Sequence, residues 1–344
     1  MHSPRKPSDA AAGPRALHVA ARIDDAVHRL RRSNGRRRGL VPTVLPFTGY
    51  GGPGWVRVLC RVVLAKPGTD SGARTGLRGW RSFTSVPVGG APVTVRAGGA
   101  ESVTHADRGG VVDARVELDL PAGWSEIELT VSGSPPVAAR IFRVGDDVEF
   151  GIVSDIDDTV MVTALPRPFL AAWNSFVLNE HARNPVPGMA VLYERLLRAH
   201  PGSPVVYLST GAWNVAPTLR RFLGRNLYPA GALLLTDWGP TYDRWFRSGP
   251  EHKRQNLRRL VDEFPNVRWL LVGDDGQHDE ELYGEIAAAA PERIAGVAIR
   301  MLSPAEAVLA GGRAQPGRGS APVPHVSAPD GAGLDARLGE LGLV

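Results

Sequence analysis

Almost continuously apolar runs alternate with helical patterns between Phe150 and Arg300, and this alternation restricts the fold more than any other feature of the chain. The apolar runs read FGIVS, SPVVYLS, GALLLTD, VRWLLVG and IAGVAI. The helical patterns between them cover Met189–Ala199, Val215–Asn226, Glu251–Glu263 and Asp279–Ala289. Strands that lack polar alternation are typical of a parallel sheet whose two faces are covered by helices. The sequence therefore predicts a doubly wound α/β fold of the Rossmann type, with its site at the carboxyl ends of the strands.

Carboxylates, hydroxyls and one lysine stand at the ends of these runs, and a parallel sheet would bring them to one edge. They are Asp155, Asp157, Asp158 and Thr159 after the first run, Ser209, Thr210 and Gly211 after the second, Lys253 at the start of the third helical pattern, and Asp274, Asp275, Asp279 and Glu280 after the fourth run.

This combination of groups suits phosphoryl transfer through a covalent intermediate. A carboxylate can attack phosphorus directly, and a hard divalent cation with oxygen ligands offsets the charge of the carboxylate and the phosphate. Hydroxyl and backbone N–H donors, together with a lysine, hold the phosphate oxygens as charge builds up in the transition state. A second carboxylate two residues further on can protonate the leaving oxygen and later deprotonate the attacking water.

Each of these motifs alone is ordinary. An Asp-x-Asp turn is more often a solvated loop, and Ser-Thr-Gly after a strand is common at helix starts. Lys253 shares its helical pattern with three arginines, as a surface lysine would, and Gly-Asp-Asp-Gly resembles any turn. The order of the motifs and their placement at strand ends favour a working site. Within it we interpret Thr159 as structural, bracing the turn, and Asp158 as solvated or as support for a neighbouring ligand.

The motifs also resemble those of a known family. DIDDT is similar to the DxDxT motif of haloacid-dehalogenase-like (HAD-like) phosphatases, and Ser209, Lys253 and GDDGQHD are similar to their second, third and fourth motifs in the same order. More specifically, DIDDT, STGAW, LLLTDW, EHKRQNL and GDDGQHDEELY resemble the catalytic domain of the actin-patch-associated phosphatidate phosphatase family. The resemblance covers about residues 150–300, and the β-rich region before it is similar to a non-catalytic domain that many bacterial members carry.

The resemblance implies a magnesium-dependent phosphatase that converts phosphatidate to diacylglycerol and inorganic phosphate through an aspartyl-phosphate. It makes Asp155 the nucleophile and a magnesium ligand, and Asp157 the acid and base that also offers its backbone carbonyl to the metal. Ser209 and Lys253 would hold the phosphoryl group. The implied phosphate-binding residues are Ser209, Thr210, Gly211 and Lys253, and the candidate metal ligands are Asp155, Asp157, Asp274, Asp275 and Asp279.

Two positions depart from the family's pattern. The turn reads Ser-Thr-Gly-Ala-Trp where Ser-x-Ser-Pro-Trp is expected, which would alter the geometry of the phosphate loop. Asp275 stands where a serine is common, so the sequence leaves open which of Asp274, Asp275 and Asp279 contacts the ion.

Residues 41–148 contain strand-like runs separated by glycine and proline, with no helical pattern between them. This pattern predicts a separate antiparallel β-sandwich domain, and residues 149–303 then form the HAD-like catalytic domain. Cys60, the single cysteine, lies in the apolar run VRVLCRVVL and is predicted to be a buried structural thiol.

Residues 1–40 carry ten Lys or Arg against three Asp, whereas the rest of the chain holds 30 basic and 32 acidic residues. We predict a basic, mostly disordered arm with a helical pattern at Arg15–Arg32, which either rests on an anionic membrane surface or serves as a solubilising tail. The nearly neutral remainder argues against nucleic acid as a partner. Residues 304–344 are rich in Gly and Pro and are predicted to be a disordered tail, with or without a short terminal helix.

The sequence has no run of about 18 apolar residues, and its first residues lack the apolar core of a secretory signal. We therefore expect a cytoplasmic protein with peripheral contact at the membrane surface and a phospholipid substrate. Two aromatic segments near the site, Val162–Pro187 and Trp238–Arg247, either fill the core or form flaps with an apolar mouth. Two other functions stay open: a phosphatase for another phosphomonoester, and a non-catalytic lipid- or protein-binding module that retains the fold.

Overall fold

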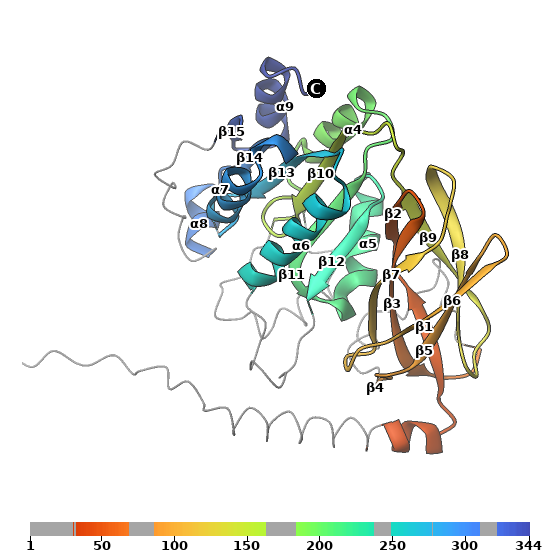
Figure 1. The fold of residues 1–344 in the computed structure, drawn as a ribbon. Helices are drawn as coiled ribbons and strands as arrows, with labels where there is room; N and C mark the ends of the chain where they lie inside the picture. Colours follow the sequence, from red (N-terminus) through yellow and green to blue (C-terminus); the bar gives the residue numbers. More distant parts are fainter. Residues whose placement is uncertain are drawn as a thin grey trace, which may run out of the picture.

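Two β-sheets organise the chain (Figure 1). The structure, a computed structural model, describes residues 30, 32–68, 86–162, 184–236, 249–276, 278–309 and 322–344. One sheet has nine strands and comes from the first part of the chain, and the other has six and comes from the second.

The six-stranded sheet is parallel throughout, with the order β12-β11-β10-β13-β14-β15. Its strands are β10 (Phe150–Asp155), β11 (Val205–Ala212), β12 (Ala232–Thr236), β13 (Arg268–Asp274), β14 (Ile294–Arg300) and β15 (His325–Ala328). The direction of strand addition reverses between β10 and β13. Ligands of doubly wound sheets bind outside the carboxyl ends of the strands at this reversal.

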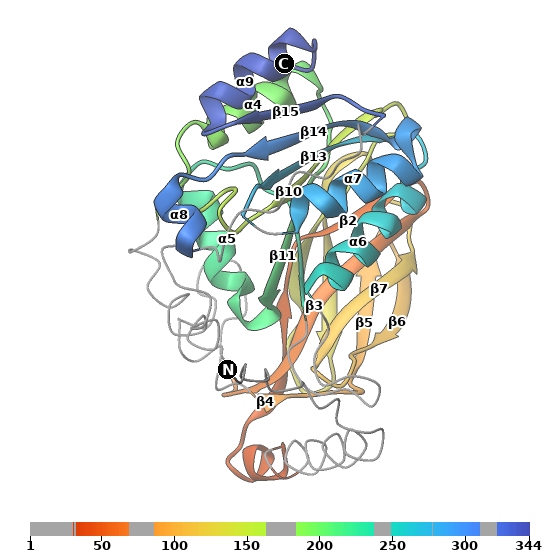
Figure 2. The same cartoon turned by 90° about the vertical axis from the view of Figure 1, so that its left-hand side faces the viewer.

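Helices cover both faces of this sheet, as the sequence predicted. They are α4 (Met189–Ala199), α5 (Ala216–Arg225), α6 (Gly249–Glu263), α7 (Asp279–Ala289), α8 (Pro304–Leu309) and α9 (Gly331–Glu340), with short 3-10 turns at Trp213–Val215 and Pro291–Arg293. α4 contacts α9, and α6 contacts α7, with the sheet between the two pairs (Figure 2). The amphipathic spacing explains the packing, since α4 buries Met189, Leu192, Tyr193 and Leu196 on one side.

The prediction of a disordered tail over residues 304–344 is wrong for the described part of this segment. β15 pairs with β14 as the edge strand of the parallel sheet, and α9 packs on α4 with Leu334 and Leu338 buried. The glycines serve close packing here: a Cβ on Gly331 would lie 2.2 Å from the carbonyl carbon of Gly188 at the start of α4. Residues 310–321 lie outside the described residues.

The nine-stranded sheet confirms that the first part of the chain is β-rich. Its strands are β1 (Val41–Pro46), β2 (Gly49–Gly52), β3 (Trp55–Ala65), β4 (Val86–Pro87), β5 (Pro92–Ala97), β6 (Ala100–His105), β7 (Val111–Glu117), β8 (Gly123–Val131) and β9 (Val137–Arg143). The pairs are antiparallel except for β2 with β9. β3 pairs with β1, β2, β4 and β7 and is the most connected strand of the sheet.

A separate sandwich domain is not confirmed. One apolar core lies within the nine-stranded sheet and includes Cys60, whose thiol pKa is raised to about 12 by burial. A second core is continuous across both sheets, because Phe47, Tyr50 and Trp55 pack in the same cluster as the strands of the parallel sheet. The two regions therefore share part of their interior.

Most of the basic arm lies outside the described residues, as do the helical pattern at Arg15–Arg32 and nearly all of the two aromatic segments. Residues 32–37 are helical, so the predicted disorder does not extend over them. Arg32 Nη1 donates a hydrogen bond to the Gly89 carbonyl at 3.1 Å. Among the helices that the structure describes, none is long and apolar enough to cross a membrane.

Substituting Gly331 with alanine should destabilise the protein, because the added methyl group has no space against Gly188. Overpacking of this kind costs about 1–3 kcal/mol. The free energy of unfolding, measured by urea denaturation, should fall by that amount.

Gly339→Ala in the same helix is the matched control, because no atom outside the neighbouring helix backbone lies within 4 Å of the added methyl group. Alanine is about 1 kcal/mol more favourable than glycine inside a helix, so this variant should be unchanged or more stable. Equal stability of the two variants would mean that α9 does not dock on α4.

Candidate active site

Three aspartates gather at the carboxyl ends of two adjacent strands. Asp155 ends β10, Asp274 ends β13, and Asp279 begins α7. One carboxylate oxygen from each lies within 4.8 Å of the other two. All three side chains are buried, with at most 2% of their surface exposed. They stand at the carboxyl ends of the strands, where the sequence predicted the site, and at the point where the strand order reverses.

One oxygen of each carboxylate lacks a hydrogen-bond donor. Asp155 Oδ2, Asp274 Oδ2 and Asp279 Oδ2 are buried and have no hydrogen-bond partner among the residues described. Buried polar atoms in native proteins are nearly always satisfied, and carboxylate oxygens are the ligands that Mg²⁺ and Ca²⁺ prefer. The donor set therefore fits a hard divalent cation.

Lys253 is buried in the same group. Its Nζ lies 2.7 Å from Asp155 Oδ1 and 2.5 Å from Asp279 Oδ1. The start of α6 approaches β11 closely, since a Cβ on Gly249 would lie 2.6 Å from the Thr210 side chain. The predicted role of Lys253 in holding a phosphate stays a prediction, and the structure shows its ammonium paired with two of the aspartates.

The electrostatics of the group follow from burial and crowding. Burial raises the pKa of Asp155 well above its ordinary value; Lys253 opposes this rise, and Asp279 adds to it. Burial and the Asp279 carboxylate likewise raise the pKa of Asp274. Burial alone would lower the pKa of Lys253, but the carboxylates of Asp155 and Asp279 raise it above its ordinary value. One ammonium faces three carboxylates, so a cation would relieve the remaining negative charge.

Asp157 faces a different partner from Asp155. Ser209 Oγ donates a hydrogen bond to Asp157 Oδ2 at 3.1 Å, and the Gly211 N–H donates to Ser209 Oγ at 3.0 Å. The register of β11 against β12 shifts between Leu208 and Ala212, and such bulges re-aim side chains next to active sites. Asp155 and Asp157 thus extend the site from Lys253 on one side to Ser209 on the other.

Asp275 lies outside the carboxylate group. Its Oδ1 accepts a hydrogen bond at 2.8 Å from the backbone N–H of Leu302, just beyond β14. Of the three candidates that the sequence left open, Asp274 and Asp279 face Asp155. The carboxylate of Asp157 is not part of this group either, and the role of its backbone carbonyl as a ligand stays a prediction.

The structure bears on two interpretations of the DIDDT turn. Of the two alternatives for Asp158, the solvated one is wrong, because the residue is only 5% exposed. Asp158 acts on a neighbouring carboxylate, since it raises the pKa of Asp274, after burial and Asp279. Thr159 is fully buried, in agreement with a structural role, but its Oγ1 has no hydrogen-bond partner in the described part of the chain, so a hydrogen bond of its hydroxyl does not brace the turn.

Sequence reasoning did not identify Arg300, which binds the backbone of the DIDDT turn. This buried residue ends β14, and its Nη1 donates to the Asp158 carbonyl at 2.7 Å. Asp158 has a φ of 61°, in the left-handed region that non-glycine residues rarely adopt. The guanidinium also bonds Glu306 Oε1 at 2.7 Å and the Pro329 carbonyl at 3.3 Å. An arginine at the end of an otherwise apolar strand was the one available signal.

The family resemblance that the motifs predicted is confirmed for the second part of the chain. Residues 150–301 match the family model described as phosphatidate phosphatase APP1, catalytic domain. Phosphatidate phosphatase APP1 of Saccharomyces cerevisiae is 26% identical over 156 residues, which are 44% of this chain and 26% of that protein. An uncharacterized protein of Schizosaccharomyces pombe is 26% identical over 150 residues, which are 43% of this chain and 24% of that protein. The chain thus spans about a quarter of the length of these curated relatives.

Among solved structures, the HAD domain of effector protein Lem4 from Legionella pneumophila is similar at 13% identity, with a TM-score of 0.30. The alignment covers 50% of this chain and 90% of that one. All the site residues named above lie between residues 150 and 301, whereas the nine-stranded sheet, β15 and α9 lie outside the matched segment.

A divalent cation should stabilise the folded protein measurably. Saturating Mg²⁺ at 100 times its Kd contributes about 2.7 kcal/mol, and each kcal/mol raises the Tm of a domain of this size by about 2–4 °C. Asp274→Asn should abolish the Mg²⁺-induced rise in Tm. Asp275→Asn is the matched control and should keep it, because its side chain faces Leu302.

Without a metal ion, the charge of Asp274 should lower the stability of the folded protein. A carboxyl group whose pKa is raised by folding binds more protons in the folded state, so stability falls as the pH rises from about 4 towards the raised pKa. Asp274→Asn removes this charge and should raise the metal-free Tm at pH 7. A lower Tm for this variant in EDTA would contradict the electrostatic account.

Proposed function

We propose that this chain, whose residues 150–301 match the phosphatidate phosphatase catalytic domain, is a magnesium-dependent phosphatase that hydrolyses phosphatidate to diacylglycerol and inorganic phosphate. The observation that carries the proposal is the buried group of Asp155, Asp274 and Asp279 around Lys253. Three unsatisfied carboxylate oxygens at the strand-order reversal suit a cation and a phosphate better than they suit a structural core.

Asp155 acts as the nucleophile in the proposed reaction. Lys253 lies 2.7 Å from its Oδ1, which opposes the rise in the pKa of Asp155 caused by burial and fixes the direction of the carboxylate. A carboxylate oxygen of Asp155 attacks phosphorus, the bond between phosphorus and the glycerol oxygen breaks, and an aspartyl-phosphate forms. Bound Mg²⁺, held by Asp155, Asp274 and Asp279, would supply charge neutralisation for the phosphate oxygens.

Asp157 acts as the general acid in the first half of the reaction and as the general base in the second. Its carboxyl group gives a proton to the leaving glycerol oxygen, and the resulting carboxylate then takes a proton from the water that attacks the aspartyl-phosphate. The hydrogen bond from Ser209 at 3.1 Å orients Asp157 toward the site. Ser209, Thr210 and Gly211 stand at the bulged end of β11, where they can hold phosphate oxygens as charge develops.

The choice of phosphatidate, and not another phosphomonoester, as the substrate rests on the family match alone. The site chemistry is the same for any phosphomonoester, so a phosphatase for another ester is the second candidate. A non-catalytic lipid- or protein-binding module that retains the fold is the third. A single assay separates the three, because it compares phosphatidate vesicles with soluble phosphomonoesters in Mg²⁺ and in EDTA.

The purified protein should release inorganic phosphate from phosphatidate in Mg²⁺ and not in EDTA. Asp155→Asn should reduce kcat by at least about 1,000-fold, because the amide cannot form the covalent intermediate. Asp275→Asn retains the acceptor for the Leu302 N–H and should stay within about threefold of the wild-type rate, the scatter typical of neutral substitutions.

Each result points to one candidate. Release from soluble esters but not from phosphatidate would favour the second function. Vesicle binding without release from any ester would favour the third. An Asp155→Asn variant with wild-type turnover would exclude the proposed nucleophile.

We also propose that the basic arm brings the protein to anionic phospholipid surfaces from the cytoplasm. Three of its arginines, Arg36, Arg37 and Arg38, are exposed at the end of the helix over residues 32–37. The β12 arrowhead in Figure 1 points towards the end of the molecule at which this helix lies. The carboxyl end of the parallel sheet and the arm could then face one membrane.

Replacing Arg36, Arg37 and Arg38 with glutamine should weaken binding to anionic vesicles by about 100-fold, since each arginine near such a surface contributes about 1 kcal/mol. Binding would be measured by vesicle sedimentation at physiological ionic strength. The control variant replaces Arg195, Arg198 and Arg337 on α4 and α9, at the far end of the molecule (Figure 1), with the same change of charge. If both variants lose vesicle binding equally, the arm has no specific role and its arginines act only through the net charge of the protein.

A further inference from the structure

We propose that the nine-stranded sheet is a positioning element of the active site: it fixes α6, which carries Lys253, and the turn that follows Ser209. The inference rests on the proposed phosphatase function. It assigns a role to residues that lie outside the matched segment 150–301 and that the sequence had placed in an independent module.

Four charged side chains form a chain of contacts that starts and ends on α6, so that together with the last turn of this helix they make a ring. Arg57 on β3 bonds Asp113 on β7 at 2.8 Å, and Asp113 accepts a second bond at 2.8 Å from Arg259 on α6. Arg57 also donates to Glu263, the last residue of α6, through Nε at 3.1 Å and through Nη2. Tyr50 on β2 donates to the other oxygen of Glu263 at 2.9 Å.

The ring is sheltered on one side and open on the other. The side chains of Arg57 and Glu263 are 11% and 8% exposed, whereas those of Arg259 and Asp113 are 23% and 32% exposed. Burial alone would raise the pKa of Asp113, but Arg259 and Arg57 hold it below its usual range. Loss of either partner of the buried Arg57–Glu263 pair would leave an uncompensated buried charge, which is costly. Exposed surface pairs contribute much less.

A line of polar contacts runs from this ring along α6 as far as His252, the residue before Lys253. Arg259 Nη2 donates to Asn256 Oδ1 at 2.5 Å, and Asn256 Nδ2 donates to the His252 carbonyl at 2.9 Å. His252, buried next to Lys253 in sequence, lies 3.4 Å through Nε2 from the Leu234 carbonyl of β12. The ring therefore fixes the axial position of the helix, and with it the distance of Lys253 from Asp155.

A second contact reaches the other side of the site. Phe47, between β1 and β2, stacks on Trp213 with ring centroids 5.0 Å apart and planes inclined by 18°. Trp213 directly follows β11 and lies four residues after Ser209. Both rings are buried, at 7% and 5% exposure. The nine-stranded sheet thus touches the two elements that carry the proposed phosphate-holding residues, at independent places.

Breaking one contact at a time tests the proposal in the full-length chain. Asp113→Ala should lower kcat about tenfold with KM within about twofold, because displacement of a positioned group by a fraction of an ångström affects the chemical step more than binding. Amide hydrogen exchange should become about tenfold faster in α6, and not in the turn after Ser209. Phe47→Ala should reverse this pattern, with faster exchange in residues 209–213 and no change in α6.

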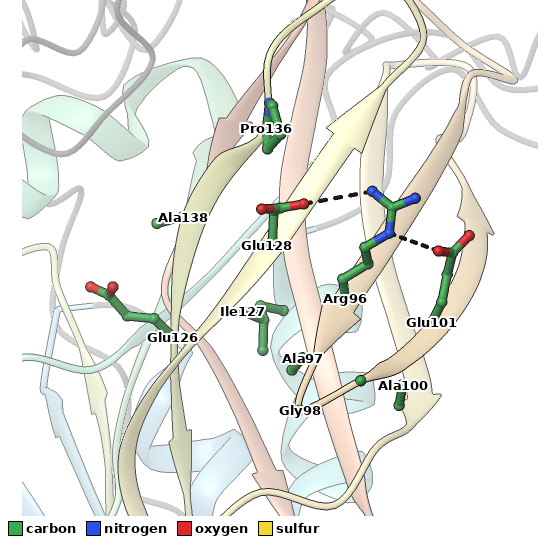
Figure 3. Close-up of a pocket in the computed structure, with 11 residues that line it drawn as sticks. Arg96, Ala97, Gly98, Ala100, Glu101, Glu126, Ile127, Glu128, Pro136 and Ala138 are labelled. Carbon is green, nitrogen blue, oxygen red and sulfur yellow. Dashed lines mark hydrogen bonds and ion pairs between the residues drawn. The ribbon is translucent and has the colours of Figure 1, made fainter.

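Glu101→Ala is the matched control, because it removes an acidic partner of an arginine in the same sheet without contact to α6. Glu101 bonds the exposed Arg96 at 2.7 Å, in a hollow of about 550 Å³ formed by β5, β6, β8 and β9 (Figure 3). This variant should keep wild-type kcat and exchange. Asp113→Glu, which can restore the pairs to Arg57 and Arg259, should recover most of the lost kcat.

The outcomes separate this inference from the proposed function. If the wild-type protein releases no phosphate from any ester, the proposed function fails, and the exchange patterns alone decide the positioning role. If Asp113→Ala matches Glu101→Ala in both kcat and exchange, the positioning role is overturned while the phosphatase stands. Equal acceleration in both elements for both variants would also overturn it, because that result indicates global loss of stability.

Discussion

The arrangement of Lys253 between Asp155 and Asp279 is the constraint on which the rest of the structure depends. Burying three carboxylates with one ammonium is unfavourable by itself, because desolvation exceeds the gain from pairing unless the geometry is tightly fixed. The groups come from different elements: β10, β13, α7 and α6. The parallel order of the sheet brings three of these elements to one edge, and the contacts of α6 bring the fourth. The fold thus holds together charges that would separate in water.

Much of the site could be predicted because its signals are local. Each proposed group follows a strand or opens a helix, and parallel packing places such positions together. The distinction between Asp274 and Asp275 could not be predicted, since adjacent side chains in a turn diverge and the direction of Asp275 is set by the N–H of Leu302. The role of Arg300 could not be predicted either, because its three partners are distributed over the DIDDT turn, α8 and the loop after β15.

The prediction of a disordered tail failed because it relied on the content of glycine and proline, and some of these glycines have a packing role. The segment around β15 and α9 resembles a linker by its content of these residues, yet Gly331 and Gly188 allow two helix starts to approach more closely than any side chain would permit. β15 has four residues and depends on β14 for its hydrogen bonds. A short edge strand of this kind carries no periodic pattern of its own, so its existence depends on a partner that sequence composition does not reveal.

The boundary of the matched segment is therefore not a physical boundary of the protein. Residues 150–301 contain the carboxylates, the lysine and the serine, but Trp213 completes its packing with Phe47. Phe264 after α6 packs against Tyr50 and Trp55 at centroid distances of 5.8 and 5.4 Å. Arg300 shares its guanidinium with Glu306 and the Pro329 carbonyl. A segment cut at the family limits would expose these faces, because the groups that cover them belong to the nine-stranded sheet, to α8 and to the loop after β15.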